Sequence, residues 1–383
     1  MLRFLTAGES HGKCLTAIIE GIPSNLNIDI EQINKKLAER QSGYGRGGRM
    51  KIETDRVEIL SGVRNGKTLG SPIALKIENK DWENWKERMD AEFFGEAEEI
   101  TKPRPGHADL AGALKYNFTD IRNVLERASA RETAVRVAVG TICFELLREF
   151  GIEIFGHVVQ IGNIEAGQSF EQELFNYRTA ESQLRCLDDQ AEAKMIELID
   201  STKNEGDSLG GIFEVVILGV PAGIGSHVQW DRKLDTKLAG AFMSIQAIKG
   251  VEIGAGFKSA AIKGSQVHDE IYFDSINGYY RNTNQCGGIE GGISNGEPIV
   301  IRAAMKPIPT LYKPLNSVDI KTKEPYKACV ERSDVCAVTA ASIVGETAAA
   351  WEIACAMTEK FAGDSIEEMK SNYQRYIEYI RMR

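Results

Sequence analysis

Apolar and polar positions alternate with two different periods along the 383-residue chain, and these periods predict both helices and strands. Apolar residues at helical spacing, or on nearly every face, predict helices over residues 30–41, 129–150, 179–203, 232–248, 333–361 and 366–382. Runs rich in β-branched and aromatic residues predict strands at residues 2–7, 57–63, 71–77, 153–164, 211–220 and 298–305.

The order of these elements indicates the fold class. Strands come in clusters separated by long helices, without the steady alternation of a parallel doubly wound sheet. We therefore expect an α+β fold in which antiparallel β-sheets pack on a helical layer. No Pro/Ser-rich linker interrupts the chain, so a single large domain over residues 1–383 is expected, with a peripheral C-terminal helix at about 364–383. Residues 80–102, rich in Trp, Glu and Lys, are interpreted as surface loops or lids.

The segment from residue 126 to residue 140 combines charge with a pattern typical of a buried helix, and its arginines are Arg127, Arg131 and Arg136. Ser129 and Glu132 match a capping box, which predicts a helix start. An unpaired buried cation is costly, and a helix start offers free N–H donors, so a phosphate is the natural guest. The alternative is that the arginines pair with Glu126 and Glu132 on a solvated face.

Composition excludes several classes of function. The net charge of −9 argues against general binding to nucleic acid or to a membrane surface. The N-terminal residues lack the apolar run of a signal peptide, and no stretch has the pattern of a membrane span. Seven scattered cysteines without a Cys-x-x-Cys pair indicate neither a disulfide framework nor a zinc site. A cytoplasmic protein with reduced thiols is expected.

Two of the five histidines, His11 and His107, lie in glycine-flanked polar turns suited to proton transfer near neutral pH. For each, a structural or merely exposed histidine is the alternative. The remaining three are interpreted as structural: His157, His227 and His268. Residues 8–12 also match the Gly-x-Ser-x-Gly nucleophile elbow with Ser10 as nucleophile. We reject that interpretation because the elbow follows several parallel strands, whereas this motif begins at residue 8.

A second candidate anion site is a glycine-rich stretch with four cations: Arg40, Arg46, Arg49 and Lys51. No acidic residue lies between Glu39 and Glu53. Glycines let the backbone approach a ligand, and arginine forks suit an anion of two or three charges. An RNA-binding Arg–Gly tract is one alternative, although such tracts form long repeats. A simple exposed loop is the other.

Three later segments carry further candidate chemistry. Residues 284–296 contain five glycines in thirteen positions, a density suited to a flat or phosphorylated cofactor. Residues 306–310, KPIPT, form a stiff cationic turn after a strand. Asp334 opens the last long apolar helix, where a carboxylate is favourable on dipole grounds alone.

Together these motifs resemble the chorismate synthase family. They occur in the family's order and at about its spacings: GESHG, SGYGRGGR, RPGHADL, RASARETAVRVA, SIQAIKGVEIG, GGIEGGISNG, KPIPT and RSDVCAV. The resemblance runs from the N-terminus to about residue 360. One departure is Thr339, where the family usually has proline, within a predicted helix. The length matches the monofunctional bacterial type, with no added segment for a flavin reductase.

The resemblance implies a phosphate lyase, that is, a carbon–oxygen lyase, of the shikimate pathway. Its substrate would be 5-enolpyruvylshikimate 3-phosphate, which loses phosphate and a ring proton in an anti-1,4 elimination to give chorismate. The reaction needs reduced FMN without net redox change, so an external flavin reductase is implied, with NADPH a candidate for the indirect electron source. The family fold is a helical layer between antiparallel sheets, assembled as a homotetramer in the cytoplasm, without nucleic-acid or membrane partners.

The resemblance also assigns residues by position. His107 would protonate the departing phosphate, His11 would protonate the reduced flavin near N1, and Asp334 would lie near N5 and relay the ring proton. The implied substrate-binding residues are Ser10, Arg40, Arg46, Arg49 and Arg131. The implied FMN-binding residues are Arg127, Ala128, Ser129, Gln246, Ala247, Gly291, Lys306, Pro307, Ile308, Pro309, Thr310 and Arg332. No metal is expected. A flavin-binding protein without activity is an alternative, against which the presence of both histidines speaks.

Overall fold

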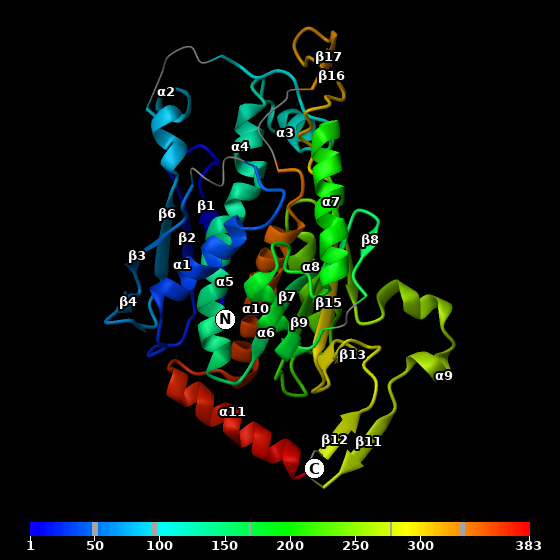
Figure 1. The fold of residues 1–383 in the computed structure, drawn as a ribbon. Coiled ribbons are helices and arrows are strands. Elements are labelled where there is room, and N and C mark those ends of the chain that lie inside the picture. The colour runs from blue at the N-terminus through cyan, green and yellow to red at the C-terminus, as the bar shows by residue number, and fades with distance from the viewer. Residues whose placement is uncertain (48–52, 93–97, 168–169, 276–277, 329–333) are drawn as a thin grey trace.

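The computed structural model describes the chain apart from residues 48–52, 93–97, 168–169, 276–277 and 329–333 (Figure 1). Within the described residues, the predicted mixture of helices and sheets is confirmed. One hydrophobic core includes buried residues from Leu2 near the first strand to Met369 in the last helix.

The first sheet has four antiparallel strands in the order β1-β2-β6-β3. Their bounds are β1 Arg3–Ala7, β2 Cys14–Glu20, β6 Ile73–Glu78 and β3 Val57–Ser61. Successive side chains of a strand point to opposite faces, so alternate residues share one face. On β2 the inward face carries Leu15, Ala17 and Ile19, which are all buried.

The second sheet has five antiparallel strands in the order β10-β15-β9-β7-β8. Their bounds are β10 Ile248–Ile253, β15 Ile299–Met305, β9 Gly211–Leu218, β7 Glu153–Ile161 and β8 Ile164–Glu165. Phe213, Val215 and Ile217 of β9 are fully buried. Between them, Glu214 contacts His157 and Arg302 on the neighbouring strands.

Long helices join the two sheets through the core. They are α1 Ile30–Gln41, α5 Thr133–Arg148, α8 Leu234–Met243 and α10 Val338–Phe361. Helix α5 packs on β2 and β6, α10 packs on β7 and β9, and the two helices pack on each other. Their crossing is close because Gly140 faces Thr347: a Cβ atom at Gly140 would lie 2.4 Å from the Thr347 carbonyl oxygen.

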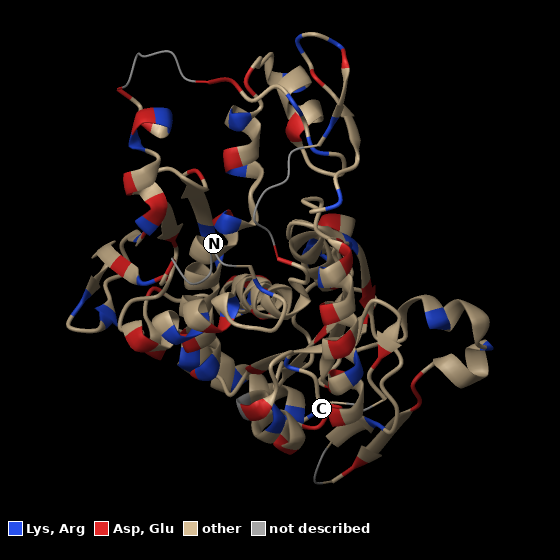
Figure 2. Cartoon of the chain, turned by 45° about the horizontal axis from the view of Figure 1, so that its top comes forward, with Lys and Arg blue, Asp and Glu red and all other residues tan. Residues whose placement is uncertain are grey.

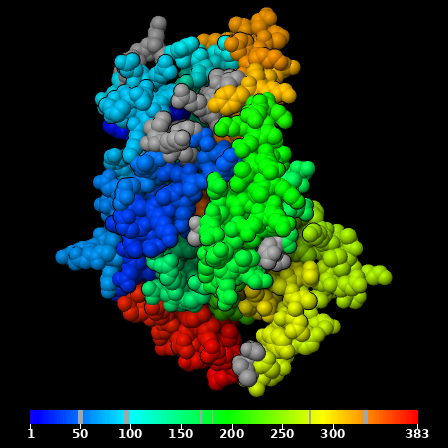
Figure 3. Space-filling model, in the orientation of Figure 1, coloured from blue at the N-terminus to red at the C-terminus, as the bar shows by residue number. Residues whose placement is uncertain are grey.

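The remaining elements lie around this centre. They are β4 Val63–Arg64, β5 Lys67–Thr68, α2 Lys86–Met89, α3 Asp109–Tyr116, α4 Arg122–Ala128, α6 Gln172–Glu181, α7 Asp189–Glu205, α9 Gly264–Val267, β11 Ile271–Asp274, β12 Gly278–Arg281, β13 Ile289–Glu290, β14 Ile293–Ser294, β16 Asn316–Val318, β17 Pro325–Lys327 and α11 Ile366–Arg381. The segment with α9, β11 and β12 projects from the body, and α11 lies beside it at the base (Figures 1 and 3).

Three expectations differ from the structure in detail. The helix expected from residue 129 starts at Thr133, because Ser129 caps a short 3-10 turn, Ala130–Glu132, through the Arg131 amide. The helix expected at 179–203 is two helices, α6 and α7, and Asp188 caps the second. The segment after residue 80 begins with a 3-10 helix, Lys80–Asn84, that buries Trp82.

The charged surface bears on the class of partner. Lys and Arg are interspersed with Asp and Glu along the outer helices in the view of Figure 2. Within the described residues, no helix combines the length and apolar character needed to cross a membrane.

The close crossing of α5 and α10 generates a prediction on stability. Gly140→Ala should lower the free energy of unfolding by about 2 kcal/mol, because the added methyl group overpacks the contact with Thr347. Gly240→Ala in α8 is the matched control, since a Cβ atom there meets nothing within 4 Å. That control should raise stability by about 0.5–1 kcal/mol through helix propensity alone. Thermal and urea unfolding followed by circular dichroism would compare the two, and a Gly140→Ala protein as stable as the parent would contradict the packing.

Candidate active site

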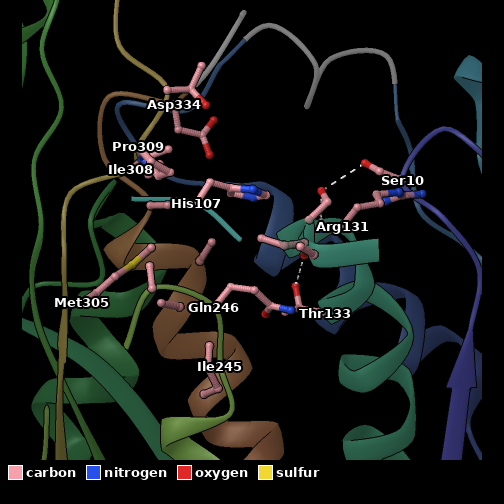
Figure 4. Close-up of a pocket in the computed structure, with 18 of the residues that line it drawn as sticks. Ser10, His107, Arg131, Thr133, Ile245, Gln246, Met305, Ile308, Pro309 and Asp334 are labelled. Carbon is pink, nitrogen blue, oxygen red and sulfur yellow. Dashed lines mark hydrogen bonds between the residues drawn. The ribbon is translucent and has the colours of Figure 1, made fainter. Parts of the chain in front are cut away.

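A cavity of about 400 Å³ opens where the end of α1, the start of α5 and the start of α10 come together (Figure 4). Its wall is completed by the turn after β1 and by loops near residues 104–108, 245–247 and 305–310. In Figure 4, His107 and Asp334 project into it from one side, and Ser10 and Arg131 lie on the other. The cavity is therefore built from segments that are far apart in sequence.

Most residues singled out from the sequence meet at this cavity. Those that line it are Ser10, His11, Arg40, Arg46, His107, Ala128, Ser129, Arg131, Gln246, Ala247, Lys306, Ile308, Pro309, Thr310 and Asp334. Arg127, Gly291 and Pro307 do not line it. Arg127 is exposed and donates to the carbonyl oxygens of Thr6 and Gly8, and Gly291 lies in the β13–β14 turn. Arg49 and Arg332 lie outside the described residues.

His107 is held by a buried carboxylate. Its Nδ1 lies 2.5 Å from Oδ1 of Asp109, which is fully buried at the start of α3. Burial raises the pKa of Asp109, but hydrogen bonds from His107 and Arg104 outweigh it and hold that pKa well below its usual range. Asp109 is therefore an anion, Nδ1 carries a proton toward it, and Nε2 is left to exchange a proton with a ligand.

His11 has the same kind of support from a different element. Its Nδ1 lies 2.9 Å from Oε2 of Glu126 on α4, and its backbone N–H donates to the same oxygen at 2.8 Å. Burial raises the pKa of Glu126, but the bonds from His11 and the charge of Arg122 outweigh it and lower that pKa. The ring of Trp85 stacks on the imidazole, with centroids 4.1 Å apart. Both cavity histidines thus have a fixed orientation and a carboxylate at Nδ1.

Two of the arginines share one carboxylate behind the wall. Arg40 donates to Oδ2 of Asp55 at 2.9 Å, and Arg131 donates to Oδ1 at 2.6 Å. Burial lowers the pKa of Arg40 to about 10 against the opposing effect of Asp55, so it stays charged at neutral pH. Burial raises the pKa of Asp55, but the two guanidinium groups outweigh it and lower that pKa. The arginines are buried, so the alternative of a solvated face paired with Glu126 and Glu132 is wrong for Arg131.

The glycine-rich loop after α1 is tied to the start of α10. Arg46 Nη1 lies 2.7 Å from Oδ2 of Asp334, and the Gly47 amide donates to Oδ1 of the same carboxylate. The Val335 amide donates to the Gly45 carbonyl oxygen, and the Tyr44 hydroxyl donates to Asp200 on α7. These contacts place Arg46 and Asp334 side by side at the cavity.

The opposite wall is apolar and suits a flat ring. It is made of Ile245, Met305, Ala337, Ala340, Ala341 and Val344. At its edge the Gln246 side chain donates through Nε2 to Glu132, while its Oε1 is buried and has no hydrogen-bond partner in the described part of the chain. Ala247 has a φ of +68°, a conformation that costs energy for a residue with a Cβ atom and is typical of functional sites. This edge offers an acceptor to a ring N–H.

The charge of the lining suits a polyanion. Its cations are Arg40, Arg46, Arg104, Arg131 and Lys306, and its one carboxylate among the described residues is Asp334, which leaves a difference of +4 with the histidines neutral. Carboxylates behind the wall balance part of this charge. A ligand with several negative charges would neutralise the remaining positive charge, so the cations would stay paired when the ligand displaces water from the cavity.

Several residues around the cavity are not predicted as site residues from the sequence, namely Asp55, Trp85, Arg104, Asp109, Arg122 and Glu126. Of these, Glu126 is considered only as an ion-pair partner of the arginines. Arg104 and Asp109 flank His107 within the motif RPGHADL, so their spacing was a usable signal. Glu126 lies 115 positions from His11, and no local pattern connects them.

The shared carboxylate predicts a pH-dependent loss of stability. Asp55→Asn should lower the free energy of unfolding by about 3 kcal/mol at pH 7, because buried Arg40 loses its counter-charge and Arg131 keeps only Glu53, 3.6 Å away. The native pKa of Asp55 lies below 3.8, so its stabilising effect is complete at higher pH and is lost only as pH falls through that native pKa. Thermal unfolding from pH 7 to about pH 2 should show a difference in stability that is constant above about pH 4 and shrinks as pH falls further. Asp231→Asn, at an exposed position, is the control. A loss of stability in Asp55→Asn that did not change with pH would contradict the role of Asp55 as the charged partner of the two arginines.

Comparisons with known proteins agree on one family. The family model described as chorismate synthase matches residues 2–358. A chorismate synthase of Desulforamulus reducens is 60% identical over 385 residues, covering all of both chains. One of Alkaliphilus metalliredigens is 62% identical over 377 residues, covering 98% of this chain and 99% of the relative. A crystal structure of chorismate synthase superposes with a TM-score of 0.81 at 47% identity, covering 100% of this chain and 99% of that one. Because the family model matches residues 2–358 and the relatives match the chain over its whole length, this chain belongs to the chorismate synthase family.

Proposed function

We propose that the chain converts 5-enolpyruvylshikimate 3-phosphate to chorismate in the shikimate pathway, as a carbon–oxygen lyase that releases phosphate. The observation that carries the proposal is the single cavity in which two carboxylate-held imidazoles face a cluster of arginines. The names of the full-length relatives point to the same activity. Atoms balance because the substrate loses phosphate and one ring proton, and no electrons are gained or lost overall.

The arginines bind and orient the substrate. Arg40 and Arg131 present guanidinium groups from opposite sides of Asp55, and Arg46 approaches from the glycine-rich loop. Guanidinium forks match the planar geometry of carboxylates and phosphates, so three of them fix the orientation of a phosphorylated dicarboxylate. Ser10 lies beside them, with its hydroxyl 3.1 Å from that of Ser129. We include Arg49 as a fourth cation on the evidence of the sequence alone.

His107 supplies a proton to the departing phosphate. Asp109 keeps Nδ1 protonated and stabilises the imidazolium, so Nε2 can donate to the leaving oxygen. Arg104, which bonds to Asp109 and to Thr310, fixes the carboxylate in turn. This arrangement makes phosphate a better leaving group, because the transferred proton removes one of the negative charges that develop on it.

Two further groups handle protons. Asp334 relays the ring proton, and Arg46 and the Gly47 amide hold its carboxylate in place. His11 presents Nε2 to the cavity as the second proton-transfer group, while Glu126 fixes Nδ1.

The apolar wall fits reduced FMN as cofactor. The buried Oε1 of Gln246 has no donor among the residues that the structure describes, and a flavin ring edge carries N–H groups that would satisfy it. When bound, reduced flavin supplies an electron-rich ring that stabilises positive charge developing at the allylic carbon. Residues that line the cavity and would hold it are Ala128, Ser129, Gln246, Ala247, Lys306, Ile308, Pro309 and Thr310. Arg127, Gly291, Pro307 and Arg332 join this set on the resemblance alone.

The wider setting is also part of the proposal. We propose one domain with a helical layer between its antiparallel sheets, which the packing of α5 on β2 and β6 and of α10 on β7 and β9 supports. The chain would work as a cytoplasmic homotetramer that receives reduced FMN from an external flavin reductase, with NADPH as the indirect electron source. The acidic net charge of −9 supports a small-molecule partner over nucleic acid.

An anaerobic assay tests the function directly. Purified protein, dithionite-reduced FMN and the enolpyruvyl substrate should give chorismate and phosphate in equal amounts. Oxidised FMN without a reductant should give no product. The same protein binding flavin without making chorismate would support the alternative of a flavin-binding protein and overturn the proposal.

His107→Ala should lower kcat by at least about 100-fold while KM for the substrate changes by less than about threefold, because the imidazole acts on the leaving group. His268→Ala, which removes a histidine of the projecting segment, is the matched control and should leave both constants unchanged. Steady-state kinetics at saturating reduced FMN measure both. Near-normal turnover of His107→Ala at saturating substrate would remove the proposed acid.

A further inference from the structure

The ring of Trp85 lies against the imidazole of His11. Their centroids are 4.1 Å apart and their planes are 28° from parallel, which is a stacked arrangement. Trp85 does not line the cavity, so it contacts the histidine from behind. A residue with this position acts on a ligand only through His11.

Four side chains close a ring of interactions around this stack. His11 bonds to Glu126, Glu126 accepts a hydrogen bond from Arg122 at 3.1 Å, and the Arg122 guanidinium lies 4.8 Å from the centroid of the Trp85 ring. A cation over an indole face is attracted by the ring quadrupole. Each member is thus held from two directions. Rotation of the imidazole would break the bond to Glu126 and the stack on Trp85 together.

Trp85 is itself anchored by the segment between β6 and α2. Its Nε1 donates to Asp81 at 3.0 Å, and Trp82 of the same segment is buried. Buried Asn79 donates to the carbonyl oxygens of Glu9 and Gly12, on both sides of His11, and accepts from Arg131 Nε at 2.9 Å. Residues 80–102 are interpreted from the sequence as surface loops or lids. The first residues of this segment instead support the wall of the cavity.

We propose that Trp85 is a positioning residue for His11, which together with Glu126 fixes the plane of the imidazole and the direction of Nε2 into the cavity. The proposal rests on the proposed function for its kinetic consequence only. Glu126 fixes one atom of the ring, and a single hydrogen bond leaves the ring free to tilt about it. The stack removes that freedom, so a small displacement of Nε2 becomes costly.

The charged groups near this stack come from three elements. They are Glu9 of the same turn, Arg122 and Glu126 of α4, and Asp81 and Arg88 of the segment that carries Trp85. Replacing the indole alters none of these charges. A comparison of Trp85→Leu, which removes the stacked ring, with Trp85→Phe, which keeps one, therefore isolates the effect of stacking.

Tryptophan fluorescence tests the contact without substrate or flavin. A protonated imidazole quenches an indole that it touches, so the emission of the parent protein should change in one step as His11 titrates. The step should be absent from Trp85→Phe and from His11→Gln, and retained in Trp230→Phe and His268→Ala. The other histidine with a ring neighbour, His157, lies near Phe170 rather than a tryptophan. A step that survives in Trp85→Phe, or no step in the parent protein, would overturn the proposal.

Kinetics test the consequence. Trp85→Leu should lower kcat about tenfold with KM for the substrate within about twofold, and Trp85→Phe, which keeps a stacking ring, should restore kcat to within about twofold. Trp230→Leu, at an exposed position, should match the parent. Thermal unfolding separates a folding defect of Trp85→Leu from a loss of positioning. Equal kcat for the Leu variant and the parent overturns the proposal. Absence of activity in the parent protein overturns the proposed function and leaves the fluorescence result standing.

Discussion

The carboxylate of Asp55 makes the cavity feasible, because it lies between two guanidinium groups that would otherwise repel each other in a buried site. Arg40 comes from the end of α1 and Arg131 from the turn before α5, so this one side chain joins two elements that both pack in the core. Two cations removed from water without an anion would cost several kcal/mol each. With the anion between them they stay charged and keep donors available toward a ligand.

Buried carboxylates support other functional groups around the cavity as well. Asp109 behind His107 and Glu126 behind His11 are buried anions that each fix one nitrogen of an imidazole. In each case an arginine, Arg104 or Arg122, bonds to the carboxylate from its other side. Each group that faces the ligand is therefore oriented by a partner behind it. Such support is what limits misplacement of reacting groups to fractions of an ångström.

The sequence predicts those parts of the fold and of the site that are determined by residues close together along the chain. It does not predict those that depend on contacts between residues far apart in sequence. Helix α1 follows its predicted bounds because its cap, Asp29, lies directly before it and accepts from Glu31. The break between α6 and α7 has one local signal, the Asp188 cap, but its geometry depends on Arg185, which adopts a φ of +57° while its guanidinium bonds to Gly156 and Glu346, far away in sequence. In the site, the motifs indicated the histidines and arginines. Their carboxylate partners became visible only in three dimensions, except for Asp109, two positions from His107.

The core and the cavity depend on the same helix crossing. The turn before α5 carries Ser129 and Arg131, and the first turns of α10 carry Ala337 and Ala341, so the two sides of the cavity are the ends of two helices that meet at Gly140. A larger residue at that crossing would separate the helices and so move the arginines away from the apolar wall. Small residues on α10 contribute in the same way, since alanine leaves room for a flat ring where leucine would fill it. The dense packing of the core is therefore a condition for the width of the cavity, and the charged residues can act only at the spacing that this packing sets.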